Sequence, residues 1–227
     1  AFYAAVRAYT QPGEGVIIMT PVYYPFFGAI ENAGRKIIRN PLLNRADDYT
    51  VDFKGLEHLC RKKENKLIIF CSPHNPVGRV WTEEELARLA DIVLRYDMII
   101  VADEIHHDLI MPGYEHKVFQ TLSHAVAERT ITCTSPSKTF NLAGLCTSNI
   151  IIKNEALRKK MSDALGSVAC GMVGTLGLEG CRVAYHEAEQ WLDHLIPVID
   201  RNQHLVREFF AANFPKITSP LVEGTYL

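Results

Sequence analysis

The sequence lacks any apolar run long enough to span a bilayer, and it lacks an excess of charge of either sign. Its 227 residues carry 24 Lys and Arg against 26 Asp and Glu, which gives a net charge of −2. So small a net charge provides no electrostatic reason to bind nucleic acid or an anionic membrane. The densest basic cluster, residues 61–63, stands at the end of an expected helix and is interpreted as a solvated face. We therefore expect neither a nucleic acid nor a membrane as a partner.

The six cysteines form no C-x-x-C pair and do not have the spacing of zinc ligands. Cys71 and Cys133 stand in apolar runs of the kind that form strands, where a buried free thiol is the ordinary case. The first residues have an amphipathic pattern, unlike the basic and then apolar pattern of a secretory signal. These features favour a reducing, cytoplasmic setting.

The composition is that of a globular protein, with 48% hydrophobic and 22% charged residues, and short apolar runs alternate with helical patterns. Residues 82–97 have apolar positions at helical spacing, and Thr82 with Glu85 predicts a capping box at the start of that helix. Apolar runs without alternation are typical of strands buried on both faces of a parallel sheet. The sequence therefore predicts an α/β fold with right-handed crossovers. The expected strands are 15–20, 66–72, 98–103, 130–135 and 148–153.

The character of the chain changes after about residue 154, because nearly everything beyond it has a helical pattern. Apolar stripes cover 154–166 and 181–214, and Pro197 is expected to kink or break the second stretch. Residues 215–227 resemble the beginning of another strand-containing unit, and the helix expected at 1–10 has no start signals. We therefore expect the chain to be incomplete at both ends.

Polar and aromatic residues follow four of the expected strands. In open parallel sheets, ligands collect beyond the carboxyl ends of the strands. If these strands are neighbours, an aromatic pair, an asparagine in a Pro-flanked turn, an acidic and histidine-rich cluster and a lysine between hydroxyls converge on one crevice. The four segments are PVYYPF (21–26), SPHNPVGRVW (72–81), DEIHHD (103–108) and SPSKTFNLAGL (135–145).

Such a collection suits an aldehyde cofactor of the pyridoxal phosphate kind. A lysine is needed to bind the aldehyde covalently and later to move the α-proton of the substrate. A carboxylate keeps the pyridine nitrogen protonated, so that the ring can accept electrons. Hydroxyls and backbone N–H groups hold a phosphate, and an aromatic face suits a flat ring.

Segments 72–81, 102–109 and 135–145, in this order, resemble the fold-type-I pyridoxal-phosphate enzymes. More narrowly, they resemble the MalY/PatB-type cystathionine β-lyases (C–S lyases) of the class I/II aminotransferase superfamily. The resemblance implies a large domain with a mainly parallel seven-stranded sheet between helices, a smaller C-terminal α+β domain and a homodimer. It places a large domain at 1–212 and the beginning of the small domain at 213–227.

The resemblance also implies site roles, position by position. Lys138 corresponds to the lysine that binds the cofactor and then transfers the proton. Asp103 corresponds to the partner of the pyridine nitrogen. Asn75 and His106 correspond to the residues that hydrogen-bond the ring hydroxyl oxygen.

The resemblance also implies three further cofactor contacts. Tyr23 is expected to stack on the ring, and Ser135 and Ser137 to help hold the phosphate.

Two positions distinguish the subgroups of the family. Many relatives that transaminate have Tyr where this chain has His106, and an Arg eight residues after the lysine, where this chain has Cys146. The histidine favours the lyase branch, and the missing arginine should weaken phosphate anchoring.

The expected function is β-elimination on cystathionine- or cysteine-type amino acids, which yields a thiol, pyruvate and ammonia. The first alternative is an aminotransferase on the same scaffold. The second is a regulatory or non-catalytic pyridoxal-phosphate-binding domain that serves as a ligand sensor, for which an upstream DNA-binding unit in the intact gene product would be the sign. The resemblance places the arginine that binds the substrate carboxylate beyond Leu227.

A metal site is the competing interpretation of DEIHHD, and we do not expect one. The adjacent residues His106 and His107 point in different directions on an extended or turning segment, and no H-E-x-x-H or cysteine pair supports them. Glu104, His107 and Asp108 are interpreted as structural or surface residues.

Several other aromatic residues are interpreted without a catalytic role. His74 is expected to hydrogen-bond locally, and Trp81 to pack in the core before the capped helix. Tyr24 is interpreted as a core residue of the turn after the first strand. Tyr185 and Trp191 are expected to pack on the long helices.

Overall fold

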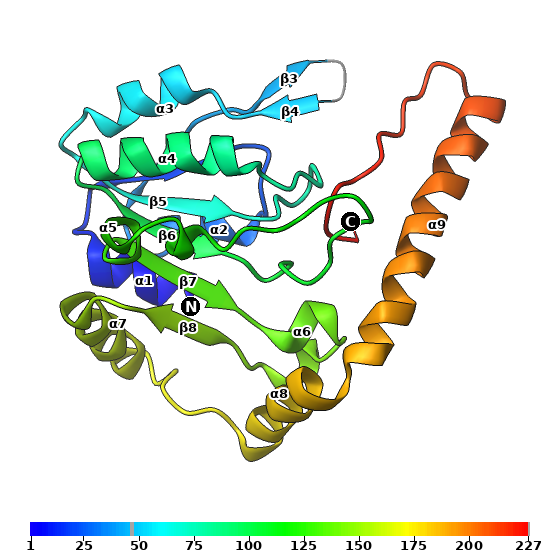
Figure 1. The fold of residues 1–227 in the computed structure, drawn as a ribbon. Coiled ribbons are helices and arrows are strands. Elements are labelled where there is room, and N and C mark those ends of the chain that lie inside the picture. The colour runs from blue at the N-terminus through cyan, green and yellow to red at the C-terminus, as the bar shows by residue number, and fades with distance from the viewer. Residues whose placement is uncertain (46–47, 227) are drawn as a thin grey trace.

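The computed structural model describes residues 1–45 and 48–226, in which a six-stranded sheet lies between two layers of helices (Figure 1). The strand order is β2-β1-β5-β6-β7-β8, and every neighbouring pair is parallel except β7 and β8. The prediction of a mainly parallel α/β sheet is confirmed. The strands are β1 (Gly15–Ile18), β2 (Lys36–Arg39), β5 (Asn65–Cys71), β6 (Ile99–Asp103), β7 (Thr130–Thr134) and β8 (Asn149–Ile152).

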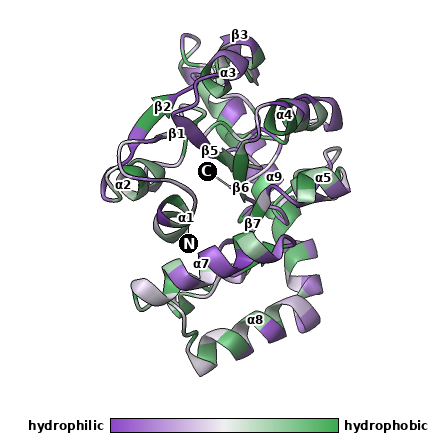
Figure 2. Cartoon of the chain, turned by 90° about the vertical axis from the view of Figure 1, so that its left-hand side faces the viewer, coloured by the Kyte–Doolittle hydropathy of each residue, from purple (hydrophilic) through white to green (hydrophobic). Residues whose placement is uncertain are grey.

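Helices cover both faces of this sheet, with their green, hydrophobic sides toward it (Figure 2). One face is covered by α3 (Phe53–Cys60), α4 (Glu83–Arg95), η1 (Phe119–Thr121) and α5 (His124–Ala127). The other face is covered by α1 (Phe2–Tyr9), α2 (Pro25–Glu31) and α7 (Glu155–Ser167). Coverage on both sides explains why the strands have continuous apolar runs.

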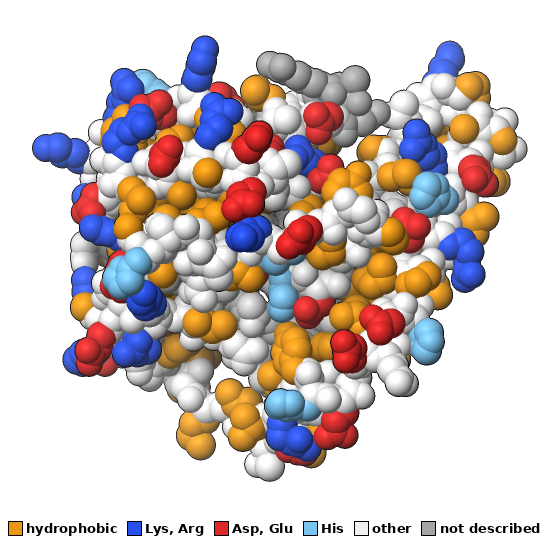
Figure 3. Space-filling model, viewed as in Figure 1, with side chains coloured by type: hydrophobic (Ala, Val, Ile, Leu, Met, Phe, Trp, Pro, Cys, Tyr) orange, Lys and Arg blue, Asp and Glu red, His pale blue; other side chains and the backbone are white. Residues whose placement is uncertain are grey.

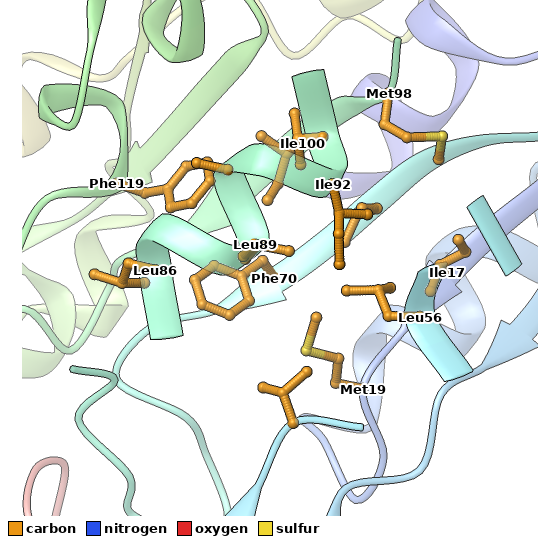
Figure 4. Packing of buried hydrophobic residues seen from close by; sticks show 14 of the residues in the cluster. Ile17, Met19, Leu56, Phe70, Leu86, Leu89, Ile92, Met98, Ile100 and Phe119 are labelled. Atoms are coloured by element: carbon orange, nitrogen blue, oxygen red, sulfur yellow. The ribbon is translucent and has the colours of Figure 1, made fainter. Parts of the chain in front are cut away.

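The core under α4 shows how the expected helical spacing is used. Leu86, Leu89 and Ile92 lie on the buried side of this helix and pack toward Phe70 and Ile100 of the sheet (Figure 4). Where α4 begins, the backbone N–H of Glu85 donates to Oγ1 of Thr82 at 3.2 Å, and the N–H of Thr82 donates back to Oε2 of Glu85 at 2.9 Å. The predicted capping box is confirmed.

Three strands were not predicted from the sequence. β2 is an edge strand whose end residues, Lys36 and Arg39, are exposed, so it has no continuous apolar run. The strands β3 (Leu43–Arg45) and β4 (Asp48–Thr50) form a separate antiparallel pair of three residues each. Such short strands carry too few residues to show a period.

The C-terminal half is helical as expected, but the break lies elsewhere. The helices α8 (Thr175–Glu187) and α9 (Glu189–Asn213) are separated at Ala188, and α9 continues through Pro197. A break at Pro197 was therefore the wrong expectation. The carbonyl that loses its N–H partner to this proline belongs to Asp193, a residue on the exposed side of the helix.

Short elements complete the carboxyl edge of the sheet: α6 (Pro136–Thr139) and η2 (Ala143–Leu145) follow β7. Residues 214–226 form no strand, but Gly224 makes an isolated antiparallel β-bridge with Ile110 in the loop after β6. In the described part of the chain, no helix has the length and hydropathy needed to cross a membrane.

Candidate active site

The four polar segments do meet at one edge of the sheet. The strands β1, β5, β6 and β7 are consecutive neighbours and parallel, so their carboxyl ends lie side by side. Figure 1 shows α6 and the C-terminal end of the described chain at this same edge. The convergence expected from the sequence is therefore present in the fold.

Asp103 is the last residue of β6, and its side chain is buried. The backbone N–H of Ile105 donates to its Oδ1 at 3.4 Å, which is a long hydrogen bond. Burial raises the pKa of the Asp103 carboxyl to about 7, while this N–H and the positive charge of Lys138 act in the opposite direction. A carboxyl so buried and so weakly hydrogen-bonded favours a cationic partner.

His106 is buried three residues further along, and its ring lies 5.7 Å from the ring of Tyr226. Its Nδ1 has no hydrogen-bond partner among the described residues. Burial lowers the pKa of His106 to about 4, with further contributions from the charges of Lys138 and His107. The ring is therefore neutral at pH 7 and offers an unused nitrogen to a ligand.

Asn75 is buried in the turn that follows β5. Neighbouring residues hold this turn: His74 Nε2 lies 2.8 Å from the carbonyl oxygen of Pro21, and Trp81 Nε1 donates to the carbonyl of Cys71 at 2.9 Å. His74 and Trp81 therefore have the local and packing roles that were predicted. They make the turn a rigid support for Asn75.

Lys138 lies in α6 and lines a cavity of about 770 Å³. Ser135 caps this helix, because its hydroxyl accepts from the N–H of Ser137 at 3.1 Å and donates to the carbonyl of Thr147 at 2.6 Å. The opposite wall of the cavity comes from α9 and from residues 219–226. Its lining residues there include Trp191, Leu195, Gln203, Val222 and Tyr226.

The family model for aminotransferase class I and II matches residues 1–219. The chain belongs to this family.

Among its relatives is the cystathionine β-lyase PatB of Bacillus subtilis (strain 168), 38% identical over 227 residues, which are 100% of this chain and 59% of the relative. Cystalysin from Treponema denticola, whose crystal structure contains pyridoxal 5'-phosphate, superimposes with a TM-score of 0.98 at 53% identity, over 99% of this chain and 57% of that one. A pyridoxal-phosphate-bound C–S lyase from Staphylococcus hominis gives 0.92 at 34%, over 99% and 56%. The chain thus spans a little under three fifths of these relatives, and the expected fold type is confirmed.

The described residues fit the cofactor of this family on three observations. A buried carboxyl at Asp103 lacks a cation, a buried nitrogen of His106 lacks a partner, and Lys138 opens onto a cavity. The position of Tyr23 is less informative, because its half-buried ring packs edge to face on Phe26 at a centroid distance of 5.7 Å.

Other expectations had mixed outcomes. Tyr24 is 80% exposed, so its interpretation as a core residue was wrong. Tyr185 and Trp191 do pack against Phe140, with ring centroids 5.5 and 6.0 Å away, but both remain partly exposed. Within residues 1–45 and 48–226, no group of three potential metal ligands is assembled.

Sequence reasoning missed the contribution of Tyr226 to the site. Its ring contacts that of His106. The segment just before Tyr226 is held in place, because the N–H groups of Glu223 and Gly224 donate to the carbonyl of Gly78 at 2.8 and 3.0 Å. The pairing spans over 140 residues, so nothing local in the sequence indicates it.

Proposed function

We propose that the chain forms the cofactor-binding part of a pyridoxal-phosphate-dependent carbon–sulfur β-lyase. Its substrates would be cystathionine- or cysteine-type amino acids, and its products a thiol, pyruvate and ammonia. The observation that carries the proposal is the meeting of Lys138, Asp103 and His106 at one edge of the sheet, where the charge of the lysine acts on both of the other groups. The lyase relatives at 38% and 53% identity support it.

The proposed roles follow from the chemistry of each side chain. The Asp103 carboxylate would hold a proton on the pyridine nitrogen, and Asn75 with the free nitrogen of His106 would bond the ring oxygen. Lys138 would bind the aldehyde. When bound, pyridoxal phosphate supplies an electron sink for the bonds at the α-carbon of the substrate.

Phosphate and ring-face contacts are proposed for Ser137, Ser135 and Tyr23. The Ser135 hydroxyl is already committed to Thr147 and Ser137, so its contribution would include fixing the start of α6. Tyr23 would have to turn its exposed face toward the ring. Cys146, exposed at the end of η2, takes the position of the family's arginine and cannot replace its charge.

Lys138 is also the proposed base. With the cofactor bound, the amine of Lys138 would remove the α-proton of the substrate, which must precede departure of the thiolate from the β-carbon. The product that leaves breaks down in water to pyruvate and ammonia.

The family resemblance supports three further proposals. The large domain would comprise residues 1–212 and the small domain would begin at 213–227, directly where α9 ends at Asn213. The active unit would be a homodimer. Six free cysteines in the described chain favour a cytoplasmic location.

The test uses full-length protein and the substitution Lys138→Ala. The wild type should show a visible absorbance band with pyridoxal phosphate, should be fixed covalently at Lys138 by borohydride, and should release thiol and pyruvate from L-cystathionine without an added 2-oxo acid. The variant should lose all three properties. A variant that retains them would refute the proposal, whereas turnover only with a 2-oxo acid would indicate an aminotransferase. Cofactor binding without any turnover would indicate a regulatory module.

A further inference from the structure

A hydrogen bond joins the helix that carries Lys138 to the loop that follows Asp103 and carries His106. The hydroxyl of Thr139, the residue after Lys138, donates to Oδ2 of Asp108 at 2.9 Å. Thr139 is completely buried. The bond therefore ties α6 to the segment after β6 from within the protein.

The other oxygen of this carboxylate faces His107. Nε2 of His107 lies 3.2 Å from Oδ1 of Asp108, and its Nδ1 lies 2.6 Å from the carbonyl oxygen of Glu104. A carbonyl oxygen only accepts hydrogen bonds, so Nδ1 carries the hydrogen and donates to Glu104, while Nε2 stays within ion-pair distance of the Asp108 carboxylate. His107 therefore lies between the carboxylate of Asp108 and the backbone of Glu104.

Glu104, whose carbonyl contacts His107, is itself held in the core. The side chain of Glu104 is buried, accepts from the backbone N–H of Phe119 at 3.0 Å, and lies 3.0 Å from Nε2 of His116. On the outer side, Tyr185 of α8 stacks on His107 with ring centroids 6.5 Å apart. The side chains of His107 and Asp108 are each only 22% exposed, so solvent screens this pair less than a surface pair.

α6 is a single turn, and these contacts secure it at both ends. Ser135 anchors its start to the carbonyl of Thr147, and Thr139 anchors its end to Asp108. Lys138 lies between the two anchors. A displacement of about 1 Å in a reacting group can cost on the order of a hundredfold in rate, so the fixing of such a short helix matters.

We infer that Asp108, held by His107, is a positioning residue that acts through Thr139 to fix the amine of Lys138 against Asp103 and His106. The inference rests on the proposed role of Lys138. It assigns a purpose to two residues of DEIHHD that the sequence alone left as structural or surface residues.

The test compares Thr139→Val, which keeps the shape and removes the hydroxyl, with Thr139→Ser, which keeps the hydroxyl. Both are made in the full-length protein with pyridoxal phosphate. The valine variant should lower kcat by about tenfold to a hundredfold with little change in KM, and should shift the midpoint pH of the visible absorbance band. The serine variant should stay within about twofold of the wild type in kcat and keep that midpoint.

Two controls separate positioning from general stability. Thr130→Val removes another buried hydroxyl, which donates to the carbonyl of Val126 at 2.7 Å and is remote from Lys138. It should lower Tm as much as Thr139→Val does, and leave kcat and the absorbance midpoint unchanged. Combining Asp108→Asn with Thr139→Val should cost no more kcat than the valine change alone, because the two residues act as one unit.

The outcomes are distinguishable from failure of the proposed function. If borohydride does not fix the cofactor at Lys138 in the wild type, the proposed function fails. If the cofactor is fixed but the valine and serine variants of Thr139 behave alike, only the positioning role is overturned. Should Thr139→Val fail to fold, Asp108→Ala alone decides, because it removes the acceptor of the Thr139 hydroxyl: unchanged kcat and absorbance midpoint in that variant would overturn the role.

Discussion

The helices α4 and α9 have the same kind of amphipathic sequence but very different surroundings. α4 has 13 residues, of which five are buried against the sheet, whereas none of the 25 residues of α9 is buried. Leu205 and Phe209 of α9 are 55% and 57% exposed. An apolar stripe therefore predicts that a helix forms and which side is apolar, but it does not identify what covers that side.

The difference arises from what each helix faces. α4 packs on β5 and β6, while α9 stands away from the sheet at the right of Figure 1. Cavities of about 770 and 660 Å³ lie on either side of the segment 218–223 and are lined in part by α9. Hydrophobic side chains, orange in Figure 3, are accordingly visible in the region of α8 and α9.

The largest expected effect tests this contrast directly. Leu89→Ala under α4 should lower the free energy of unfolding by about 2–5 kcal/mol, because the side chain is buried and leaves a cavity. The matched change Leu205→Ala in α9 should cost less than about 0.5 kcal/mol. Urea unfolding of the 227-residue chain measures both. Equal costs would mean that α9 is covered in solution.

The second prediction concerns pH and the buried edge of the sheet. The pKa of Asp103 is about 7 in the folded chain against an ordinary value of 3.8, so the folded state keeps this proton between these pH values when the unfolded state has lost it. Stability of the cofactor-free chain should therefore fall as pH rises from about 4 to 7, by up to about 4 kcal/mol, and stay low above pH 7.

Asp103→Asn removes this titration. The variant should show a flatter dependence of Tm on pH over the same window and should be more stable than the wild type at pH 8. No such contrast is expected for an exposed carboxyl such as Asp163, whose side chain is 66% exposed on α7. If Asp163→Asn changed the pH profile as much, burial of Asp103 would not be its cause.

The contrast between buried and open regions also shows which features can be predicted. The five predicted strands and the capped helix follow from local patterns, because continuous apolar runs and the Thr82–Glu85 spacing depend on neighbours in sequence. The edge position of β8, where Ile151 is exposed, was not contained in its apolar run. The edge strand β2, the break at Ala188 and the Thr139–Asp108 bond depend on pairing and packing between distant segments. No local pattern contains that information.

The same distinction holds for the candidate site. Its members were found because strand ends in a parallel sheet must lie together, which sequence order is enough to indicate. The surroundings of each member were not predictable. The bonds that occupy Ser135, the free nitrogen of His106 and its contact with Tyr226 all depend on the three-dimensional arrangement.

A third, smaller effect on stability is expected at Arg79, which joins α4 to the C-terminal segment 214–226. Arg79 is buried, and its guanidinium bonds Glu85 of α4 at 2.9 Å and Glu223 of the C-terminal segment at 2.9 Å. Arg79→Leu should cost about 2–3 kcal/mol, below the range for fully buried pairs because both carboxylates are partly exposed. It should also speed proteolysis within 214–226.

The matched control is the pair Arg182–Glu179 on α8, whose side chains are exposed. Arg182→Leu should change neither Tm nor the rate of proteolysis appreciably, since solvent screens an exposed ion pair. Cleavage within 214–226 at the wild-type rate in Arg79→Leu would show that the Arg79–Glu223 pair does not hold this segment, and that its other bonds, such as those to Gly78 and Leu109, are sufficient.

The smallest expected effect on stability concerns the N-terminal ends of α4 and α8. Thr82→Ala removes the capping box of α4 and should cost about 1 kcal/mol, whereas the N-cap residue of α8 is Gly174, which has no side chain to cap the helix. Gly174→Asp should gain a few tenths of a kcal/mol, because a carboxylate can accept from the free N–H groups there and the backbone at Gly174 is already extended. Both changes are measurable by urea unfolding. A loss of stability in Gly174→Asp would mean that the N-terminal end of α8 is covered in solution and is not exposed to solvent as it is in the structure.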